Sequence, residues 1–586
     1  MPDRAPTFLG RVRHVLGSQV TIALDDELAG VAPIYRGRLQ PVGQIGSLVR
    51  IPQGPVDLLG TVTLVGIAEL AGTAVPVDAL QRGERWLQVQ LVGEVDRASG
   101  RFHRGVGSYP GLDDATHFAV VDDLIAVFPA PGPNHLRLGR LAASEDVTVA
   151  VDAQKLVTRH TAIVGSTGSG KTSGVAALLQ GFCSGGWTGA NIVVIDPHGE
   201  YRHALGGQAS VRSVLGSGDA RLRVPFWALP AVDILRAFGA GGATATAVRR
   251  FQELVAAARR RFADTCDWLH LEPAAITSDT PVPFDLRAVW HEFDRENNET
   301  RRVKADPTTA EILEEGDSAQ LRPTTFAPNG PGGAPPHQGP TYGTYGAAPE
   351  HLRIGLLDPR LAFLHTDELD PGEDPLVRTM QEWLGGDRPV SVLDFAGVPT
   401  AAAELAIGVI LQLLFEVAIR SGTDEAGIGR ARPVLIVLEE AHRYLGEQAA
   451  PIAREAANRV AREGRKYGVG LMLVTQRPSE LPDTALAQCG TIISLRLTNS
   501  ADQAKVRHAL PDTVAGLSET LPSLRTGEAI ASGEALVLPA RLLIDLPDPR
   551  PQADDPTLEA WRSPGSIATI DPALQRWRGI YATEGQ

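Results

Sequence analysis

Residues 165–172, GSTGSGKT, have the composition and spacing of a phosphate-binding loop. In this pattern, glycines let backbone N–H groups converge on a phosphate at the N-terminus of a helix. The Lys171 ammonium can reach the β- and γ-phosphates of a nucleoside triphosphate, and the Thr172 hydroxyl can coordinate Mg²⁺. A chance glycine-rich turn is the alternative, but the apolar residues before the loop and the helical pattern after it favour nucleotide binding. The expected nucleotide-binding residues are Gly165, Ser166, Thr167, Gly168, Ser169, Gly170, Lys171, Thr172 and Ser173.

Two adjacent carboxylates, Glu439 and Glu440, follow an apolar run. Beside a phosphate-binding loop, such a pair can hold the hydration shell of Mg²⁺ and orient or deprotonate the attacking water. We assign Glu439 to the metal side and Glu440 to the water. An acidic helix N-terminus, where carboxylates favour the helix dipole, is the alternative. The guanine-reading sequence N-K-x-D is absent from the chain, so ATP is favoured over GTP.

A further acidic residue, Asp196, ends the apolar residues 191–196. The carboxyl ends of parallel strands face the ligand crevice, so this side chain is expected near Mg²⁺ or its waters. An aspartate that caps the following turn is a close alternative.

A basic cluster, Arg462, Arg465 and Lys466, precedes the apolar residues 469–475. Apolar residues spaced by four in 451–463 predict a helix, with Gly464 as its left-handed cap. Basic residues at a helix C-terminus stabilise it by about 0.3–1 kcal/mol, and this effect alone would explain the cluster.

Topology gives the same cluster a second interpretation. If strand 433–438 ends at the nucleotide edge of the sheet, then strand 469–475 starts at the far edge, roughly 20 Å away. Gln476 then arrives beside the phosphates and can sense the γ-phosphate, while Arg465 begins far from them. If Arg465 serves catalysis, it acts on the ATP of a neighbouring subunit as an arginine finger in trans. The residues alone leave both interpretations open.

The elements that must position these groups form an α/β core. Helical patterns separate most of the apolar, β-branched runs, and continuous runs of this kind fit a parallel sheet covered on both faces. We therefore predict a three-layer core with a mostly parallel sheet. Its expected strands are 160–164, 191–196, 389–395, 433–440, 469–475 and 491–497.

The chain divides into five expected segments. Residues 1–145 read as a small antiparallel N-terminal β-barrel with a connector, in which nothing looks catalytic, so docking or assembly is its expected role. The core occupies 146–230 and 386–525. Between its two parts, 231–385 is expected to be a helical insertion whose Pro/Gly-rich stretch, 326–350, is disordered or loosely held. One or two strands and an extended Pro-rich tail are expected in 526–586.

Charge limits the possible contacts with nucleic acid. The 586 residues carry a formal charge of −14, which argues against general affinity for DNA and requires any contact to come from a local basic surface. One arginine-rich segment could line a pore, although a solvated charged face is the simpler interpretation. Its arginines are Arg249, Arg250, Arg259, Arg260 and Arg261.

Cysteine and hydropathy patterns indicate the compartment. Cys183, Cys266 and Cys489 lack metal-ligand spacing, as is usual in a reducing compartment. The first ten residues contain no apolar signal segment. The apolar stretch 401–420 includes charged residues and is better explained as a buried amphipathic helix than as a membrane span. A soluble, cytoplasmic protein without membrane contact is expected.

Four motifs together resemble the HerA family of hexameric ATPases, relatives of the FtsK-type DNA translocases. They are HTAIVGSTGSGKT, VVIDPHGEY, LIVLEEAH and EGRKYGVGLMLVTQRPSELP. The N-terminal barrel resembles the HAS barrel of that family, and LPARLLIDLPDPRP resembles its C-terminal brace strand and tail. The resemblance covers about 1–230 and 385–560, and it is specific in the four core motifs and loose in the barrel.

The resemblance implies a RecA-like P-loop core and a homo-hexameric ring with ATP and Mg²⁺ at each junction. Such rings move double-stranded DNA through the pore, usually with a nuclease such as NurA. Some bacterial members instead pair with sirtuin-like or nuclease effectors in antiphage defence. The matching positions are Lys171 and Thr172 for phosphate and Mg²⁺, Glu440 as catalytic carboxylate, Gln476 as sensor, Arg465 as trans finger and Arg159 as a second trans arginine.

Two departures from the family pattern qualify this inference. The first acid of the pair is Glu439 instead of the aspartate common in related ATPases, and the stretch 326–350 has no counterpart. Two other functions stay open: an assembly platform whose nucleotide state recruits a defence effector with little DNA movement, and a secretion or conjugation ATPase at a membrane.

Overall fold

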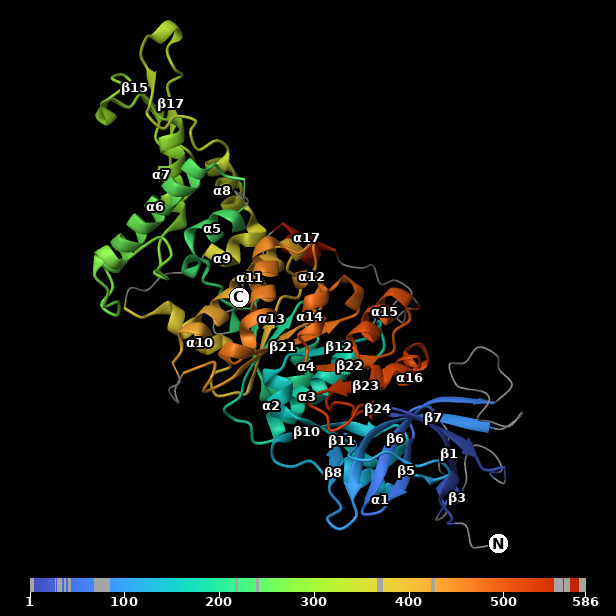
Figure 1. The fold of residues 1–586 in the computed structure, drawn as a ribbon. Coiled ribbons are helices and arrows are strands. Elements are labelled where there is room, and N and C mark those ends of the chain that lie inside the picture. The colour runs from blue at the N-terminus through green and yellow to red at the C-terminus, as the bar shows by residue number, and fades with distance from the viewer. Residues whose placement is uncertain are drawn as a thin grey trace.

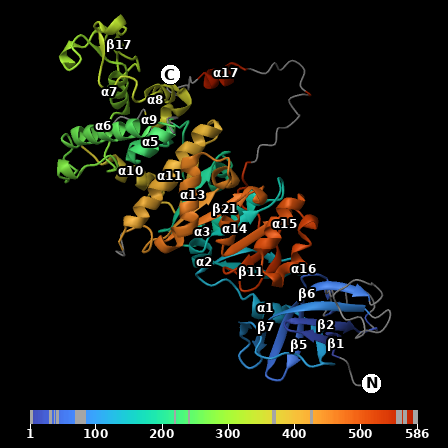
Figure 2. The ribbon, with the colours of Figure 1, turned by 45° about the horizontal axis from the view of Figure 1, so that its top comes forward.

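A computed structural model describes three regions arranged along one elongated molecule (Figure 1). The N-terminal barrel lies at one end and the insertion at the other, with the α/β core between them; a second view shows the same order (Figure 2). The residues that the structure describes are 5–26, 28, 34–35, 38–39, 44–67, 85–216, 220–238, 242–365, 372–422, 427–552, 562 and 570–578. Much of the tail expected in 526–586 lies outside them.

The N-terminal region is a closed antiparallel barrel, as predicted. Six strands follow the order β2-β1-β9-β5-β6-β7, and β7 pairs back with β2 to close the sheet. Alternate side chains such as Val12, Ile22 and Val89 fill the interior. The strands are β1 (Phe8–Leu16), β2 (Gln19–Leu24), β5 (Leu48–Gln53), β6 (Val56–Ile67), β7 (Arg85–Asp96) and β9 (Ala115–Phe118), with β8 (Phe102–Arg104) added beside β7.

The core is built on an eleven-stranded sheet whose larger part is parallel, which confirms the RecA-like α/β class. Its parallel strands, in spatial order, are β22 (Thr491–Leu495), β12 (Thr161–Val164), β21 (Val469–Thr475), β20 (Val434–Leu438), β13 (Asn191–Asp196), β19 (Val390–Asp394) and β14 (Ser210–Ser213). Four antiparallel strands continue the sheet beyond β22: β23 (Glu528–Gly533), β24 (Ala540–Ile544), β10 (His135–Leu141) and β11 (Ser144–Asp152). The sequence predicted the parallel strands except β14, and it did not predict β10 or β11.

Both faces of the parallel strands are buried, which explains their continuous apolar sequences. In β21, Leu471 and Leu473 face one hydrophobic core, while Met472 and Val474 face the other. One core is covered by α2 (Ala153–Thr158), α3 (Lys171–Ser184) and α4 (Tyr201–Leu205), and the other by α11 (Thr400–Arg420) and α13 (Pro451–Glu463). These are the three predicted layers.

Helix α11 is the apolar stretch 401–420. Among the described residues, it is the helix whose length and composition would allow a membrane span, yet most of it is buried inside the molecule. Its polar side chains serve packing: Gln412 donates to Asp233, and Glu416 pairs with Arg459. The contacts are those of a core helix.

The insertion consists of helices and two small hairpins. The helices are α5 (Ala231–Ala237), α6 (Ala245–Ala263), α7 (Leu286–Asn298), α8 (Ala348–Leu357), α9 (Ala362–His365) and α10 (Pro375–Trp383), and the hairpin strands are β15 (Thr300–Arg301) with β18 (His337–Gln338) and β16 (Ile312–Glu314) with β17 (Thr325–Phe326). The hairpins extend from the helices at the tip of the molecule (Figure 1).

The prediction that 326–350 is disordered or loosely held is wrong. The Tyr345 ring stacks on Phe293 at 4.7 Å between centroids, and the Trp290 indole N–H donates to the Pro349 carbonyl at 3.0 Å. The stretch is rich in Pro and Gly, but Tyr345 and the Pro349 carbonyl anchor it to α7.

The arginines of α6 mostly serve the fold. Arg259 is fully buried, and its guanidinium donates to the carbonyls of Trp227, Leu229 and Ser278. Arg250 pairs with Glu296, and Arg260 donates to the Ile276 carbonyl. Arg249 and Arg261 are exposed.

The prediction that Gly464 is a left-handed helix cap is also wrong. Gly464 has φ −53°, and the chain continues through a 3₁₀ turn, Gly464–Tyr467, to Gly468, whose φ is +73°. Gly464 is required for close packing instead, because a Cβ there would lie 2.4 Å from the Val469 carbonyl oxygen.

Replacing Arg259 by Leu should destabilise the insertion, because three buried carbonyls would lose their donor. We expect the thermal midpoint to fall by about 5 °C or more, with faster proteolysis within 231–385. Arg249→Leu, on the exposed face of the same helix, is the matched control and should leave both unchanged. Equal effects of the two substitutions would contradict a structural role for Arg259.

Candidate active site

The phosphate-binding loop lies between β12 and α3, at the carboxyl edge of the parallel strands. Gly168 and Gly170 have φ of +70° and +103°, which side chains other than glycine rarely adopt. The loop is anchored on both sides, because the Gly165 amide donates to the Thr475 carbonyl and the Ser166 amide to the Arg496 carbonyl. Residues 165–173 therefore form the cradle at the start of a helix that their sequence predicts.

Lys171 and Gln476 meet at this loop. The Lys171 ammonium donates to the Ser166 carbonyl at 3.2 Å, and the Thr167 hydroxyl donates to the Gln476 side-chain oxygen at 2.6 Å. Burial lowers the pKa of Lys171, while Glu440, Glu439 and Glu200 act in the opposite direction. β21 thus delivers Gln476 to the phosphate-binding loop, as its topology predicts.

Glu440 has a strained backbone and a carboxylate oxygen without a hydrogen-bond partner among the described residues. Its backbone is left-handed, with φ +52°, a strained conformation for a side chain of this size. Its Oε2 is buried and has no hydrogen-bond partner among the described residues. His442 Nδ1 lies 3.2 Å away but pairs with the Thr475 hydroxyl at 3.0 Å. An unpartnered carboxylate oxygen beside a phosphate-binding loop can accept a water proton.

Glu439 lies deeper than its neighbour. It is buried beneath the sheet edge, where the Tyr201 hydroxyl donates to its Oε1. Burial raises its pKa from 4.5 to about 8, and the nearby carboxylates of Glu200, Asp196 and Glu440 add to the rise. Glu439 is therefore largely neutral at pH 7.

Asp196 caps the turn that follows β13, which is the alternative that the sequence left open. Its carboxylate accepts hydrogen bonds from the backbone amides of His198, Gly199 and Tyr201, at 3.2, 2.8 and 3.0 Å. Burial raises its pKa, against the effect of these amides. These bonds hold the turn that places Tyr201 against Glu439.

The donor set fits an Mg²⁺ ion bound mainly by nucleotide and water. Among the described residues, no three carboxylate, imidazole or thiol groups converge on one point. Mg²⁺ in nucleotide sites commonly takes phosphates, waters and one or two protein oxygens. The Thr172 hydroxyl, at the start of α3, is the protein oxygen best placed for that role.

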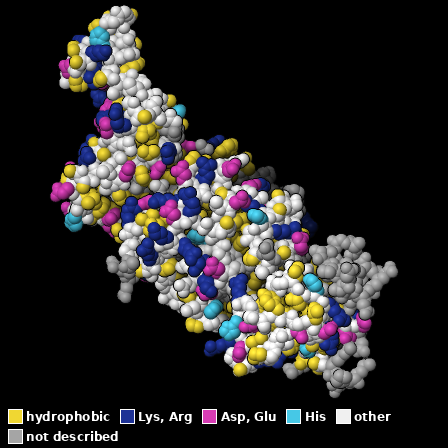
Figure 3. Space-filling view, in the orientation of Figure 1, with side chains coloured by type: hydrophobic (Ala, Val, Ile, Leu, Met, Phe, Trp, Pro, Cys, Tyr) yellow, Lys and Arg dark blue, Asp and Glu magenta, His cyan; other side chains and the backbone are white. Residues whose placement is uncertain are grey.

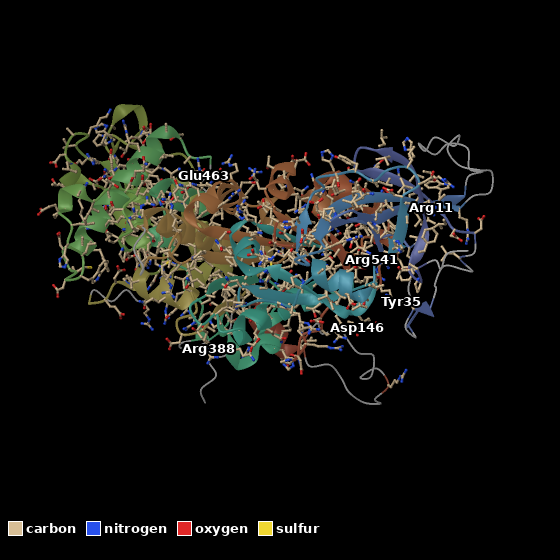
Figure 4. All side chains as sticks on the ribbon, turned by 60° about the horizontal axis from the view of Figure 1, so that its bottom comes forward. Arg11, Tyr35, Asp146, Arg388, Glu463 and Arg541 are labelled. Carbon is tan, nitrogen blue, oxygen red and sulfur yellow. The ribbon has the colours of Figure 1, made fainter. Side chains whose placement is uncertain are left out.

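The two arginines expected to act in trans lie at the opposite edge of the sheet. Arg159 follows α2 and precedes β12, and it pairs with Glu534 at 3.0 Å. Arg465 precedes β21 and is exposed. Glu463, the last residue of α13, is also exposed (Figure 4). The full length of β21 separates Arg465 from Gln476, so the structure does not bring either arginine to the phosphate-binding loop of its own chain.

Several contributing residues escaped the sequence analysis. Tyr201, Glu200 and His442 lie within or beside the nucleotide site, and Thr475 pairs with His442. Thr475 is the last residue of β21, and the other three lie four or five residues after the end of β13 or β20. Polar residues within five positions of such a strand end were the available signal.

Replacing Glu440 by Gln should preserve nucleotide binding and lower the rate of ATP hydrolysis by about 10²–10⁴-fold, since the acceptor for the water proton is lost. Turnover and the affinity for a fluorescent ATP analogue are the measurements, with the exposed Glu463→Gln as control. Hydrolysis at the parent rate would exclude Glu440 as the base.

Glu439 makes stability depend on pH. Because its pKa is raised from 4.5 to about 8, the folded chain holds a proton that the unfolded chain releases between those values. Stability must therefore fall as pH rises through that window. Glu439→Gln should remove this part of the dependence when thermal midpoints are measured without nucleotide. If the thermal midpoints of the parent protein and Glu439→Gln change with pH in parallel, the raised pKa of Glu439 is contradicted.

Comparison with known proteins agrees with this site. The family model described as the central domain of helicase HerA matches residues 136–414, and the HerA-like C-terminal model matches 389–537. A probable helicase of Methanocaldococcus jannaschii is 25% identical, over 82% of this chain and 83% of that protein.

Two proteins described as DNA double-strand break repair helicase HerA also match. The one from Pyrococcus furiosus is 24% identical, over 72% of this chain and 71% of its own. The one from Sulfolobus acidocaldarius is 38% identical over a shorter part, 25% of this chain and 30% of its own. Since the two family models together span most of the core and the insertion, the chain belongs to the HerA family of P-loop ATPases.

Proposed function

We propose that this chain is one subunit of a homo-hexameric ring that hydrolyses ATP at each junction and moves along or unwinds double-stranded DNA. The observation that supports it is the division of catalytic groups between two edges of the sheet. The phosphate-binding loop, Glu440 and Gln476 lie at one edge, and Arg465 and Arg159 at the other. Only a neighbouring copy can place those arginines at the nucleotide.

The chemistry of the proposed site divides among a few groups. The loop amides and Lys171 bind the phosphates, and Thr172 coordinates the metal. Mg²⁺, when bound, neutralises charge on the phosphate oxygens. Glu440 accepts the proton of the attacking water through Oε2, which accepts no hydrogen bond from the described residues. Gln476, bonded to Thr167, senses the γ-phosphate, and the neighbour's arginines stabilise the charge that develops in the transition state.

The match to the relatives supports DNA as the substrate, because two of them are described as DNA double-strand break repair helicases. Lys and Arg side chains gather on the surface over α10, α13 and β21 (Figure 3), which gives the acidic chain a local basic face. None of the described residues of the barrel belongs to the site, and the barrel is the proposed docking region for a nuclease or antiphage effector. A cytoplasmic location is part of the same proposal.

An assembly platform that recruits an effector with little DNA movement is the second candidate. The observation that favours it is the use of the α6 arginines in the fold, since Arg250 and Arg260 are bonded within the insertion and Arg259 to the segment just before it. A motor should hydrolyse ATP faster with duplex DNA. A platform should respond to its protein partner instead.

Arg465→Ala should preserve nucleotide binding and ring mass and lose most hydrolysis, by about 10³-fold or more. Mixing Arg465→Ala with Lys171→Ala subunits should restore part of the activity, because some junctions then combine an intact loop with an intact arginine. The mass of the mixed rings and their ATPase rate are the measurements. Without any recovery in confirmed mixed rings, the trans arrangement fails.

A further inference from the structure

The turn that carries Arg465, residues 464–468, is held from one side by the loop before β20. The Arg430 guanidinium donates to the Lys466 carbonyl at 3.0 Å and lies over the Tyr467 ring, 5.6 Å from its centroid. Gly429 packs directly on Gly468, where a Cβ would lie 2.1 Å from the Gly429 oxygen. This side of the turn has no freedom to shift toward the loop.

The other side of the turn is held by His160, the residue directly after Arg159. Its ring is buried, with 4% of the residue exposed. The Leu471 amide donates to its Nδ1 at 2.9 Å, and its other ring nitrogen donates to the Ala461 carbonyl. One imidazole therefore joins the start of β21 to the last turns of α13.

The backbone explains why a side chain occupies this position. β12 pairs with β21 only from Thr161, opposite Met472, because His160 has a left-handed φ of +49°. The Leu471 amide precedes the first pair and would be left buried without an acceptor. The His160 ring supplies that acceptor while its backbone turns away toward Arg159.

The ring lies beside the first residue of the turn. A Cβ built on Gly464, the first residue of the turn, would lie 3.4 Å from Cε1 of His160. Burial lowers the pKa of His160 to about 4, so the ring is neutral near pH 7, with one nitrogen accepting and the other donating. The contacts on both nitrogens fix its orientation.

We propose that His160 is the positioning residue of the two trans arginines. It joins the backbone that carries Arg159 to α13 and β21, the two elements on either side of the turn that carries Arg465, so both guanidinium groups are presented to the neighbouring subunit at one fixed spacing. The inference rests on the trans arrangement proposed above. It assigns His160 to the neighbour's nucleotide site and not to its own.

His160→Asn is the most direct test. Asparagine tolerates a left-handed backbone, and its side-chain oxygen can still accept from Leu471, while the donor to Ala461 and the contact with Gly464 are lost. We expect unchanged nucleotide affinity and ring mass, and turnover lower by about 10- to 100-fold, as small displacements of catalytic groups cause. Thr161→Val is the matched control, since it removes a buried hydrogen bond to Leu156 at the same junction without touching the turn.

Mixed rings separate positioning from general stability. His160→Asn subunits keep their own loop, so mixing them with Lys171→Ala subunits should restore activity, whereas mixing them with Arg465→Ala subunits should not. A general loss of stability would give the same ATPase activity in both kinds of mixed ring. The same choice should hold for His160→Gln, which keeps a donor toward Ala461 and replaces the Asn variant if the latter does not assemble.

The outcomes distinguish the two proposals. Full turnover of His160→Asn, or no recovery with Lys171→Ala while the Arg465→Ala and Lys171→Ala pair recovers, would overturn the role of His160. Failure of the Arg465→Ala and Lys171→Ala pair itself would overturn the trans arrangement.

Discussion

Two neighbouring parallel strands, β12 and β21, determine how the site can work. Each carries a nucleotide-facing group at its carboxyl end, the phosphate-binding loop in one case and Gln476 in the other. Each is preceded by an arginine, Arg159 or Arg465. A strand is stiff and adds about 3.3 Å per residue, so β21 holds its two ends roughly 20 Å apart. The arginine and the phosphate of one chain therefore cannot meet, and under the proposed trans arrangement assembly is a condition of catalysis.

The nucleotide edge of the sheet also holds a carboxylate under strain. Glu440 occupies a left-handed conformation, which costs on the order of 1–3 kcal/mol. Backbone bonds on both sides maintain it, since the Ala441 amide donates to the Val474 carbonyl and the Arg443 amide to the Glu440 carbonyl. Below it, Glu439 accepts a hydrogen bond from the Tyr201 hydroxyl, and burial keeps it largely neutral against the effect of that bond. The pair thus divides into one carboxylate with an unpartnered oxygen beside the loop and one fully buried acid, although the sequence shows two identical residues.

The sequence was sufficient where a residue pattern maps directly onto backbone geometry. The loop 165–172, the parallel strands except β14, and the meeting of Gln476 with the loop follow from glycine spacing, apolar runs and strand direction. Asp196 shows the limit of such prediction. Whether its carboxylate binds near a metal or accepts hydrogen bonds from backbone amides depends on the conformation of the turn that follows, which supplies three amides here. Gly464 shows a second limit. A glycine is needed there because the Val469 carbonyl lies too close for a Cβ, and this contact is known only once β21 has been placed in the fold. In 326–350, composition predicted disorder, but Tyr345 anchors the stretch through a ring far away in sequence.

The dependence of catalysis on assembly can be measured directly by dilution. The ATPase rate per subunit and the particle mass should be determined on the same samples across a range of protein concentrations. If each nucleotide site needs an arginine from the neighbouring subunit, turnover per subunit must fall in proportion to the fraction of dissociated chains. A dissociated subunit that hydrolyses ATP as fast as the assembled particle would contradict the account.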